Sequence, residues 1–384
     1  MTQILYQELI KIKETTNFDE ICDALGTLLY VPDVSVKPQI LYILLSYLRE
    51  KFELPEYRIK VFIAYSGNEF KGFIICKTDP YYTSYGRKCG VFGWIFAEDF
   101  ITCKNLMKSC EEFVKQHKIR KLRGPINFPK SLGGLGHQVM GFNEQILYGV
   151  AFNNPESNVL LYLERLGYEK ESQYSCMRVD KRLWDHGRHI DKDIIFRYFD
   201  LNGVIEKKNE ILELGKNSFH EVLPDASGRD ERFQQFIDTF RQIPQNWRIV
   251  SDDFIPEAYS TVPQFIDAWQ SCDLDKIEIF APMAFDKTTG QLVGILLGLP
   301  DLYESWRGDP ITRCNVDTAM VKQEYVGKGI FSALNNIGQL TANLFGISYF
   351  EGTSIWSNNE QAVHTIFPHC SPLRKHYIVQ KRMK

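Results

Sequence analysis

The sequence has little net charge and no long apolar run. Its 45 Lys and Arg residues against 48 Asp and Glu residues give a formal net charge of -3 over 384 residues. A chain so balanced has no overall field that attracts nucleic acid, so we predict no nucleic-acid partner and expect any anion site to be local. The longest apolar run, ILYILLSYL at 40–48, is far short of the ~20 residues of a membrane-spanning helix. This run predicts a helix packed against a core, with peripheral contact to a membrane surface as the alternative.

Signals for disulfide, metal and nucleotide-loop chemistry are also missing. The nine cysteines are scattered and never form a C-x-x-C pair, which favours buried thiols in a reducing compartment. No basic flank with an apolar core marks a signal peptide, so we expect a cytoplasmic protein. His186 and His189 have metal-like spacing but no strong third ligand, so we predict no metal site. The G-x-S-x-G elbow, the P-loop and the dinucleotide G-x-G-x-x-G are absent as well.

An aromatic content of 13% and a length of 384 residues predict two folded domains with real cores. Residues 4–16 and 38–52 have helical periodicity. From there the first half predicts, in order, a hairpin (58–80), a strand (88–99), a helix (100–119), a strand (120–128), a helix (157–170) and a strand (172–180).

The second half repeats this order. It predicts a strand (193–201), helices (203–243), a hairpin (276–301), a strand (313–325), a helix (329–346), a strand (347–356), a helix (358–367) and a strand (374–383). Two copies of a mixed α/β unit therefore account for the chain. We place the domains at 1–185, the first copy, and 190–384, the second copy, on either side of a charged stretch.

A glycine-rich turn opens a helix in the second copy. A strand ending at Val321 leads into VGKGIF at 326–331. A helix start offers unpaired N–H groups and the positive end of the dipole, and glycines allow a phosphate to approach closely. The turn therefore predicts a pyrophosphate site, although a bare G-x-G is equally a tight structural turn. The matching turn of the first copy, FAEDF, has two carboxylates that repel phosphate, so we expect only the second copy to bind.

This order of elements resembles the GNAT superfamily of acyl-CoA-dependent N-acyltransferases. The turn matches both glycines of the family signature but has Val326 where Arg or Gln is usual and Phe331 where Gly or Ala is usual. NNEQA resembles the family's N-x-x-A, while Ile366 and Phe367 stand where many members carry a tyrosine that protonates the thiolate. A G-P-x-N segment, GPINF at 124–128, resembles a poorly characterised bacterial group of two-copy GNAT proteins.

The resemblance implies two tandem GNAT-like domains, each with a mixed, mainly antiparallel sheet flanked by helices. It also implies acetyl-CoA or another acyl-CoA as co-substrate, held where one strand, here 314–321, splays from its neighbour and pairs with the pantetheine amides. The implied carrier-binding residues are Met320, Val321, Val326, Gly327, Lys328, Gly329, Ile330, Phe331 and Asn359.

The general base is harder to assign. Glu351 and His364 rank first because their elements border the acceptor side, and Asp317 on the splayed strand is the third candidate. An isolated strand carboxylate is more often solvated or paired. The leading hypothesis is an N-acyltransferase acting on a small-molecule or lipid amine. The alternatives are a degenerate two-copy fold that binds acyl-CoA without turnover, favoured by the departures at 326, 331 and 366, and acylation of a protein or an aminoacylated carrier.

One further stretch of the first copy stands out. GPINFPKSLGGLGHQVMGF, at 124–142, is long and rich in glycine. Such a stretch suits a binding loop on a rigid scaffold, and a surface loop without a ligand is the alternative.

Overall fold

The computed structural model describes residues 9–84, 86–179, 190–218, 230–243, 262–270, 281–359 and 370–384. The strands of the first half are β1 (Lys11–Thr15), β2 (Arg58–Ser66), β3 (Glu69–Ser84), β4 (Arg87–Ala97), β5 (Lys121–Gly124), β6 (His137–Met140) and β7 (Glu169–Arg178). Those of the second half are β8 (Ile194–Arg197), β9 (Met283–Asp286), β10 (Leu292–Pro300), β11 (Arg313–Val321), β12 (Tyr349–Trp356) and β13 (Pro372–Arg382).

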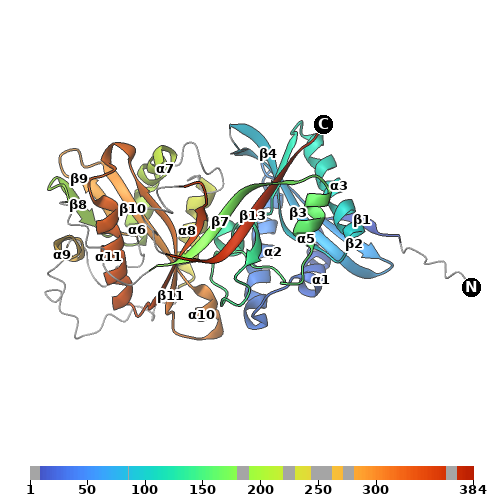
Figure 1. Cartoon of the computed structure of the whole chain (residues 1–384), viewed down its shortest axis with the longest axis horizontal. Helices are drawn as coiled ribbons and strands as arrows, with labels where there is room; N and C mark the ends of the chain where they lie inside the picture. Colours follow the sequence, from blue (N-terminus) through green and yellow to red (C-terminus); the bar gives the residue numbers. More distant parts are fainter. Residues whose placement is uncertain are drawn as a thin grey trace, which may run out of the picture.

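Within the described residues, these strands form one 13-stranded sheet that runs through both halves (Figure 1). Its order is β1-β2-β3-β4-β5-β13-β7-β12-β11-β10-β9-β8, and β6 pairs with β13 beside this path. The pairs β4–β5 and β11–β12 are parallel, and the other described pairs are antiparallel. The predicted fold class, a mixed and mainly antiparallel sheet with helices, is confirmed.

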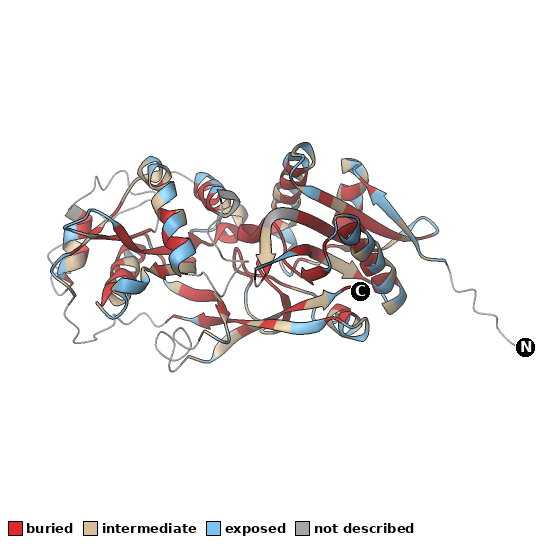
Figure 2. Ribbon diagram, turned by 90° about the horizontal axis from the view of Figure 1, so that it is seen from above, coloured by how far each residue is buried: buried red, intermediate tan, exposed pale blue. Residues whose placement is uncertain are grey.

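Helices cover both faces of the sheet (Figure 2). On β2, alternate residues belong to different cores. Ile59, Val61 and Ile63 share one buried cluster with the helices at 18–28 and 37–53. Phe62 and Ala64 share another with the helices at 100–116 and 159–165. This is the period of a strand that is buried on both sides. The helices are α1 (Phe18–Leu28), α2 (Lys37–Glu53), α3 (Phe100–Gln116), α4 (Lys130–Gly133), α5 (Val159–Arg165), α6 (Leu201–Glu206), α7 (Lys208–Ser218), α8 (Asp230–Arg241), α9 (Pro263–Gln270), α10 (Leu302–Arg307) and α11 (Ile330–Leu344).

The two halves exchange their last strands. By position in the repeat, β7 is the last strand of the first copy, yet it pairs with β12 of the second copy. In the same way β13, the end of the second copy, pairs with β5 of the first. The two exchanged strands lie side by side and antiparallel where the halves meet (Figure 1). The division into 1–185 and 190–384 stays a prediction, since residues 180–189 lie outside the described ranges.

The helix predicted for residues 4–16 is wrong over its described part. Lys11–Thr15 is instead strand β1, antiparallel to β2. Ile10 and Ile12, two residues apart, pack against the same core cluster, so the period that matters is that of a strand. The helix starts later, at Phe18, where the Asn17 side chain accepts hydrogen bonds from two backbone N–H groups.

The stretch 124–142 is not an exposed loop, which corrects the expectation of a surface position. Residues 121–138 are buried throughout. Ile126, Phe128, Leu132 and Leu135 are each at most 8% exposed, and they hold the stretch in the core. It contains the single turn α4 and the strand β6. Its glycines serve close packing instead, as at Gly133, where an added Cβ would lie 2.4 Å from Asn127 Cβ.

The other predicted elements that the structure describes follow the predicted order, whereas α1, α9 and α10 were not predicted. The hairpin β2–β3 turns between Ser66 and Glu69, and β9–β10 turns where Asp286 accepts hydrogen bonds from the backbone of Thr288 and Thr289. The second-half helix predicted at 358–367 lies outside the described residues beyond Asn359. Among the helices described, we find none with the length and apolar character to cross a bilayer.

Candidate functional site

Each copy contains a pair of parallel strands with a short paired stretch. In the described part of the second copy, β11 pairs with β12 only from Arg313 to Val316. On its other side, β11 has a bulge at Asp317, because Leu297 pairs with Thr318 while the next residue, Gly298, pairs with Val316. Bulges redirect side chains and are common beside active sites. The separated strands and the bulge therefore mark a candidate site at 317–321.

The glycine turn lies directly beyond this strand. Gly327 and Gly329 have φ angles of 88° and 78°, a region that favours glycine. Gly329 caps α11 without any side-chain hydrogen bond. In the part of the chain that the structure describes, no hydrogen-bond acceptor is paired with the N–H groups of Gly327, Gly329 and Ile330. A Cβ added at Gly327 would meet no atom within 4 Å, so the turn is open at this residue.

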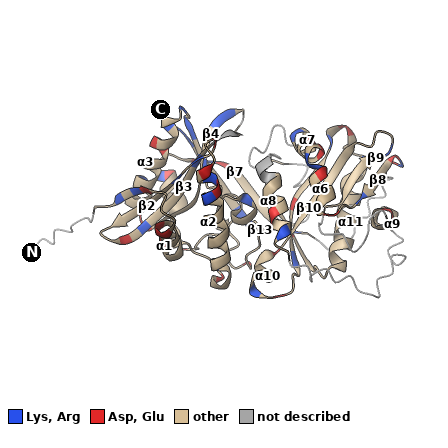
Figure 3. Ribbon diagram, turned by 180° about the vertical axis from the view of Figure 1, so that it is seen from behind, with Lys and Arg blue, Asp and Glu red and all other residues tan. Residues whose placement is uncertain are grey.

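Local charge at the turn is mixed. The Lys328 ammonium lies 3.3 Å from Asp191 Oδ2 and 4.5 Å from the centre of the Tyr325 ring. The Tyr325 hydroxyl donates to Asp286 Oδ2 at 2.8 Å. Elsewhere, Figure 3 shows basic and acidic residues interspersed along the ribbon in both halves. Lys328 is thus the positive side chain of the glycine turn itself.

The same positions in the first copy are occupied by the chain itself. Asp99 caps α3, and its carboxylate accepts a hydrogen bond from Thr102 N at 2.7 Å where an anion would otherwise bind. Beside β4, Ile126 N donates to Phe92 O at 2.8 Å, and Trp94 N donates to Asn127 Oδ1 at 2.7 Å. We call residues 124–134 the plug segment, because they continue from the end of β5 and lie against β4 beyond the pairing of these two strands.

The plug segment packs tightly against β4 at Gly93 and Trp94. A Cβ at Gly93 would lie 2.0 Å from Ile126 O. Trp94 is held in a left-handed conformation (φ 47°), and its indole N–H donates to Phe128 O at 2.7 Å. That the first copy binds no carrier stays a prediction, for which the sequence signals were the two carboxylates of FAEDF and its lack of glycine.

The predicted base candidates have very different surroundings. Asp317 lies in the bulge, with its side chain 6% exposed, and it accepts a hydrogen bond from the Thr318 hydroxyl at 2.7 Å. Glu351 is fully buried and takes two hydrogen bonds from Arg374, at 2.8 and 3.2 Å, and one from the Tyr349 hydroxyl at 2.8 Å. A carboxylate committed to a buried guanidinium favours a structural role over that of a base.

The other predicted site residues are only partly described. His364 lies outside the described residues, as do positions 366 and 367. Asn359 ends the turn after β12, where its N–H donates to Trp356 O at 2.9 Å. Phe331 is half-buried in the first turn of α11, and Val326 is exposed. Met320 and Val321 form the end of β11, where Val321 O accepts a hydrogen bond from the Ser218 hydroxyl at 3.4 Å.

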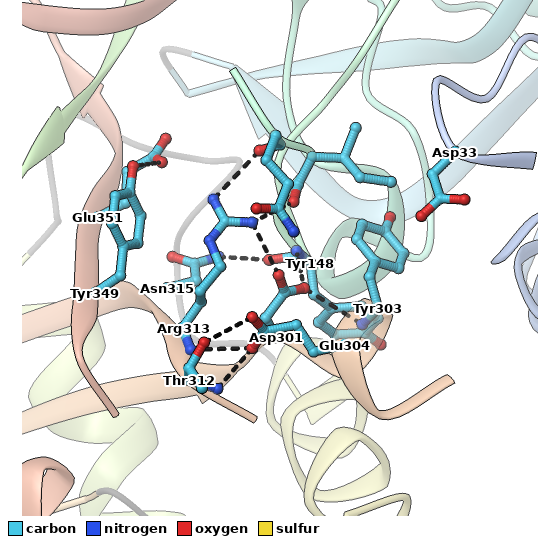
Figure 4. A network of polar contacts seen from close by, with 12 residues as sticks. Asp33, Tyr148, Asp301, Tyr303, Glu304, Thr312, Arg313, Asn315, Tyr349 and Glu351 are labelled. Atoms are coloured by element: carbon cyan, nitrogen blue, oxygen red, sulfur yellow. Dashed lines mark hydrogen bonds and ion pairs between the residues drawn. The ribbon is translucent and has the colours of Figure 1, made fainter. Parts of the chain in front are cut away.

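Sequence reasoning missed a polar network that joins the two halves near this site (Figure 4). Arg313 donates to Ile146 O at 2.7 Å and to Asp301 Oδ2 at 3.2 Å, and Asn315 Nδ2 donates to Tyr148 O at 2.9 Å. Burial raises the pKa of Asp301 to about 7, although the Arg313 charge opposes this shift. No local pattern could have revealed the contacts of Arg313 with Ile146 and of Asn315 with Tyr148, since their partners come from opposite halves of the chain.

A metal centre finds no support in the described part of the chain, which has no group of three or more His, Cys, Asp or Glu side chains placed to hold an ion. His186 and His189, the residues with metal-like spacing, lie outside the described residues.

No protein-family model and no curated protein sequence matches the chain. Solved structures do match. The chain is similar to a tandem GNAT protein from the clavulanic acid biosynthesis pathway, with a TM-score of 0.54, 11% identity and coverage of 97% of this chain and 98% of that one. A GCN5-related N-acetyltransferase from Sphaerobacter thermophilus has a TM-score of 0.52 at 11% identity, with coverage of 97% and 95%. A glucosamine N-acetyltransferase region of a fungal GH3 β-N-acetylglucosaminidase has a TM-score of 0.55 at 9% identity, with coverage of 98% of this chain and 38% of that one.

Proposed function

We propose that this chain, which has the tandem GNAT fold that its sequence predicts, is an acyl-CoA-dependent N-acyltransferase with one carrier site, in the second copy. The observation that carries this proposal is the contrast between the copies. The start of α11 offers N–H groups and open space beside separated strands, whereas the start of α3 is capped and its strands are filled. At these low identities the solved structures support the fold alone, so the activity rests on this geometry.

Carrier binding would use the main chain of the glycine turn. The N–H groups of Gly327, Gly329 and Ile330 suit the diphosphate of an acyl-CoA, and the Lys328 ammonium adds a positive charge. The edge of β11 at Met320 and Val321 would pair with the pantetheine amides as an added strand does. Asn359, after β12, would lie beside the pantetheine arm. Val326 and Phe331 differ from the residues that are usual in the family signature. Because the proposed contacts are mainly with the backbone, these two side chains do not remove them.

Acyl transfer would then follow by direct attack. The amine nitrogen forms a bond to the thioester carbonyl carbon, the C–S bond breaks, and the thiolate leaves with the bonding electron pair. Asp317 is the described candidate for taking the amine proton, since it lies in the bulge where the strands separate. A main-chain N–H near Met320 or Val321 would donate to the oxyanion of the tetrahedral intermediate.

The acceptor class is a small-molecule or lipid amine. The described similarity to a glucosamine N-acetyltransferase region supports trying amino sugars among the acceptors. The second candidate function is binding of acyl-CoA without turnover. It is favoured by the ion pair between Glu351 and Arg374. Glu351 is one of the two carboxylates considered as the general base, and this pairing engages it in a structural contact. We propose a cytoplasmic location on the sequence signals already given.

The experiment that tests this proposal substitutes a glycine at each end of α11. Gly327 and Gly346 both have left-handed φ angles, 88° and 79°, and a Cβ meets no atom within 4 Å at either position. Gly327→Ala and Gly346→Ala therefore cost similar stability, roughly 1 kcal/mol each. Only Gly327→Ala places a methyl group in the proposed diphosphate site. Loss of one charge-assisted hydrogen bond predicts acetyl-CoA binding weaker by about 10- to 100-fold for that variant alone, measured by calorimetry.

Turnover is measured in parallel with a thiol-reactive chromogen. The wild-type protein is mixed with acetyl-CoA or palmitoyl-CoA and with a hexosamine, a polyamine or an aminolipid. Thiol release that requires the amine supports the enzyme, and binding without release supports the second candidate. Equal affinity of the Gly327 and Gly346 variants for acetyl-CoA would overturn the proposed site.

A further inference from the structure

A lysine of the first copy reaches the bulge of the second. Lys130 begins α4, inside the plug segment, and its ammonium lies 3.9 Å from Asp317 Oδ1. Both side chains are buried, at 8% and 6% exposure. Two charges so far removed from water interact more strongly than a surface pair does. The segment that fills the space in one copy therefore also places a charge beside the candidate base of the other.

The backbone that carries Lys130 is held firmly. Asn127 Nδ2 donates to Gly133 O at 3.0 Å, and Asn127 N donates to Gly134 O at 3.1 Å. Gly134 N in turn donates to Lys130 O at 3.0 Å, which closes the turn of α4. Beyond these bonds, α4 packs against α8 of the second half, and Ser131 N donates to Gln235 Oε1 at 3.5 Å. Lys130 therefore starts from a rigid turn that both halves hold.

We propose that Lys130 is a positioning residue for the acyl-transfer site, whose ammonium keeps the Asp317 carboxylate charged in the bulge of β11. This inference rests on the proposed function. Lys130 itself transfers no proton and forms no bond with substrate; it acts through Asp317. A buried carboxyl group that loses its neighbouring cation has a raised pKa. A larger fraction of it is then already protonated at neutral pH and cannot accept the amine proton.

The arrangement explains why two copies stay joined in one chain with a single carrier site. In the first copy the plug segment replaces the carrier, with Ile126 paired to Phe92 as an added strand would be. A few residues later the same segment supplies Lys130 to the second copy. The first copy thus has a defined task at the catalytic site, beyond extending the sheet.

The test compares four variants in full-length protein: Lys130→Met, Lys130→Arg, Asp317→Asn and the double variant Lys130→Met/Asp317→Asn. Lys130→Met should lower kcat by about tenfold or more while acetyl-CoA affinity changes less than twofold. Lys130→Arg keeps the charge and should restore most of kcat. The double variant should be no slower than Asp317→Asn alone, because the proposed effect of Lys130 on kcat passes through that carboxylate.

A matched control is Lys121→Met, another buried lysine of the first copy, whose ammonium donates to the Ser84 hydroxyl at 2.9 Å away from the plug segment. It should leave kcat within about twofold of wild type. Thermal unfolding shows that each variant is folded, and Lys130→Arg provides a folded test if Lys130→Met does not fold.

The outcomes separate this inference from the proposed function. Absence of acetyl-CoA binding or of turnover in the wild-type protein would overturn the proposed function and this inference with it. Normal turnover in wild type together with an unchanged kcat in Lys130→Met would overturn the inference alone. Equal loss in Lys130→Met and Lys130→Arg, or simple additivity in the double variant, would do the same.

Discussion

Replacing Glu351 with glutamine asks whether this carboxylate fastens the fold or takes a proton. Glu351 is fully buried, and it is bound through both oxygens to Arg374, which is itself 2% exposed (Figure 4 labels Glu351 beside Tyr349). Glu351→Gln keeps the shape but leaves the guanidinium without its counter-ion. Removing one partner of a buried pair typically costs about 3–5 kcal/mol of unfolding free energy.

That cost translates into a measurable melting shift. If the shared sheet makes the 384 residues unfold as one unit, the entropy of unfolding is roughly 0.8 kcal/mol/K. The variant should then melt about 4–6 °C below wild type in differential scanning calorimetry. At a temperature where both proteins are folded, its kcat should stay within about threefold of wild type. Replacing both partners, in Glu351→Leu/Arg374→Met, should recover much of the lost stability.

The opposite pattern would refute this reasoning. An unchanged melting temperature with a kcat lowered by about a hundredfold or more would assign Glu351 to proton transfer, as the sequence first suggested.

Two other predictions follow from the contacts between the halves. Residues 9–179 and 190–384 expressed separately should each lack the cooperative unfolding of the whole chain, because β7 and β13 complete the sheet of the opposite copy; two independently folded halves with sharp melting transitions would contradict the strand exchange. For Asp301, burial raises the folded pKa to about 7 from the ordinary 3.8, so the folded protein holds this proton longer than the unfolded chain does. The unfolding free energy of wild type, compared with Asp301→Asn, should therefore fall as pH rises from about 4 to 7, measured by urea unfolding, and a rise over that range would contradict it.

The order of hairpins, strands and helices could be predicted from the sequence because each depends on local periodicity and turn residues. β1 was missed because Leu5, Leu9 and Ile12 have helical spacing, and the partner strand that selects the strand period is not visible in the sequence. The burial of the plug segment had a signal in its regularly spaced apolar residues, such as Ile126, Phe128 and Leu132. Its glycine content outweighed that signal.

The contacts that define the candidate site could not be predicted in the same way. The strand exchange depends on which of two similar edges β7 and β13 join, and a single sequence does not encode that choice locally. The pairing of Glu351 with Arg374 requires the register of β12, β7 and β13 together. Lys130 reaches Asp317 only because the plug segment crosses from one copy to the other.

The most direct measurement is the stoichiometry of carrier binding. Isothermal titration of CoA into the whole chain should give one site per chain, because the start of α11 is open to an anion whereas Asp99 caps α3 and the plug segment fills the first copy. Two sites per chain would contradict the closed state of the first copy. A dissociation constant of about 1 mM corresponds to a binding free energy of roughly 4 kcal/mol. No heat of binding at CoA concentrations up to that value would contradict the carrier site itself.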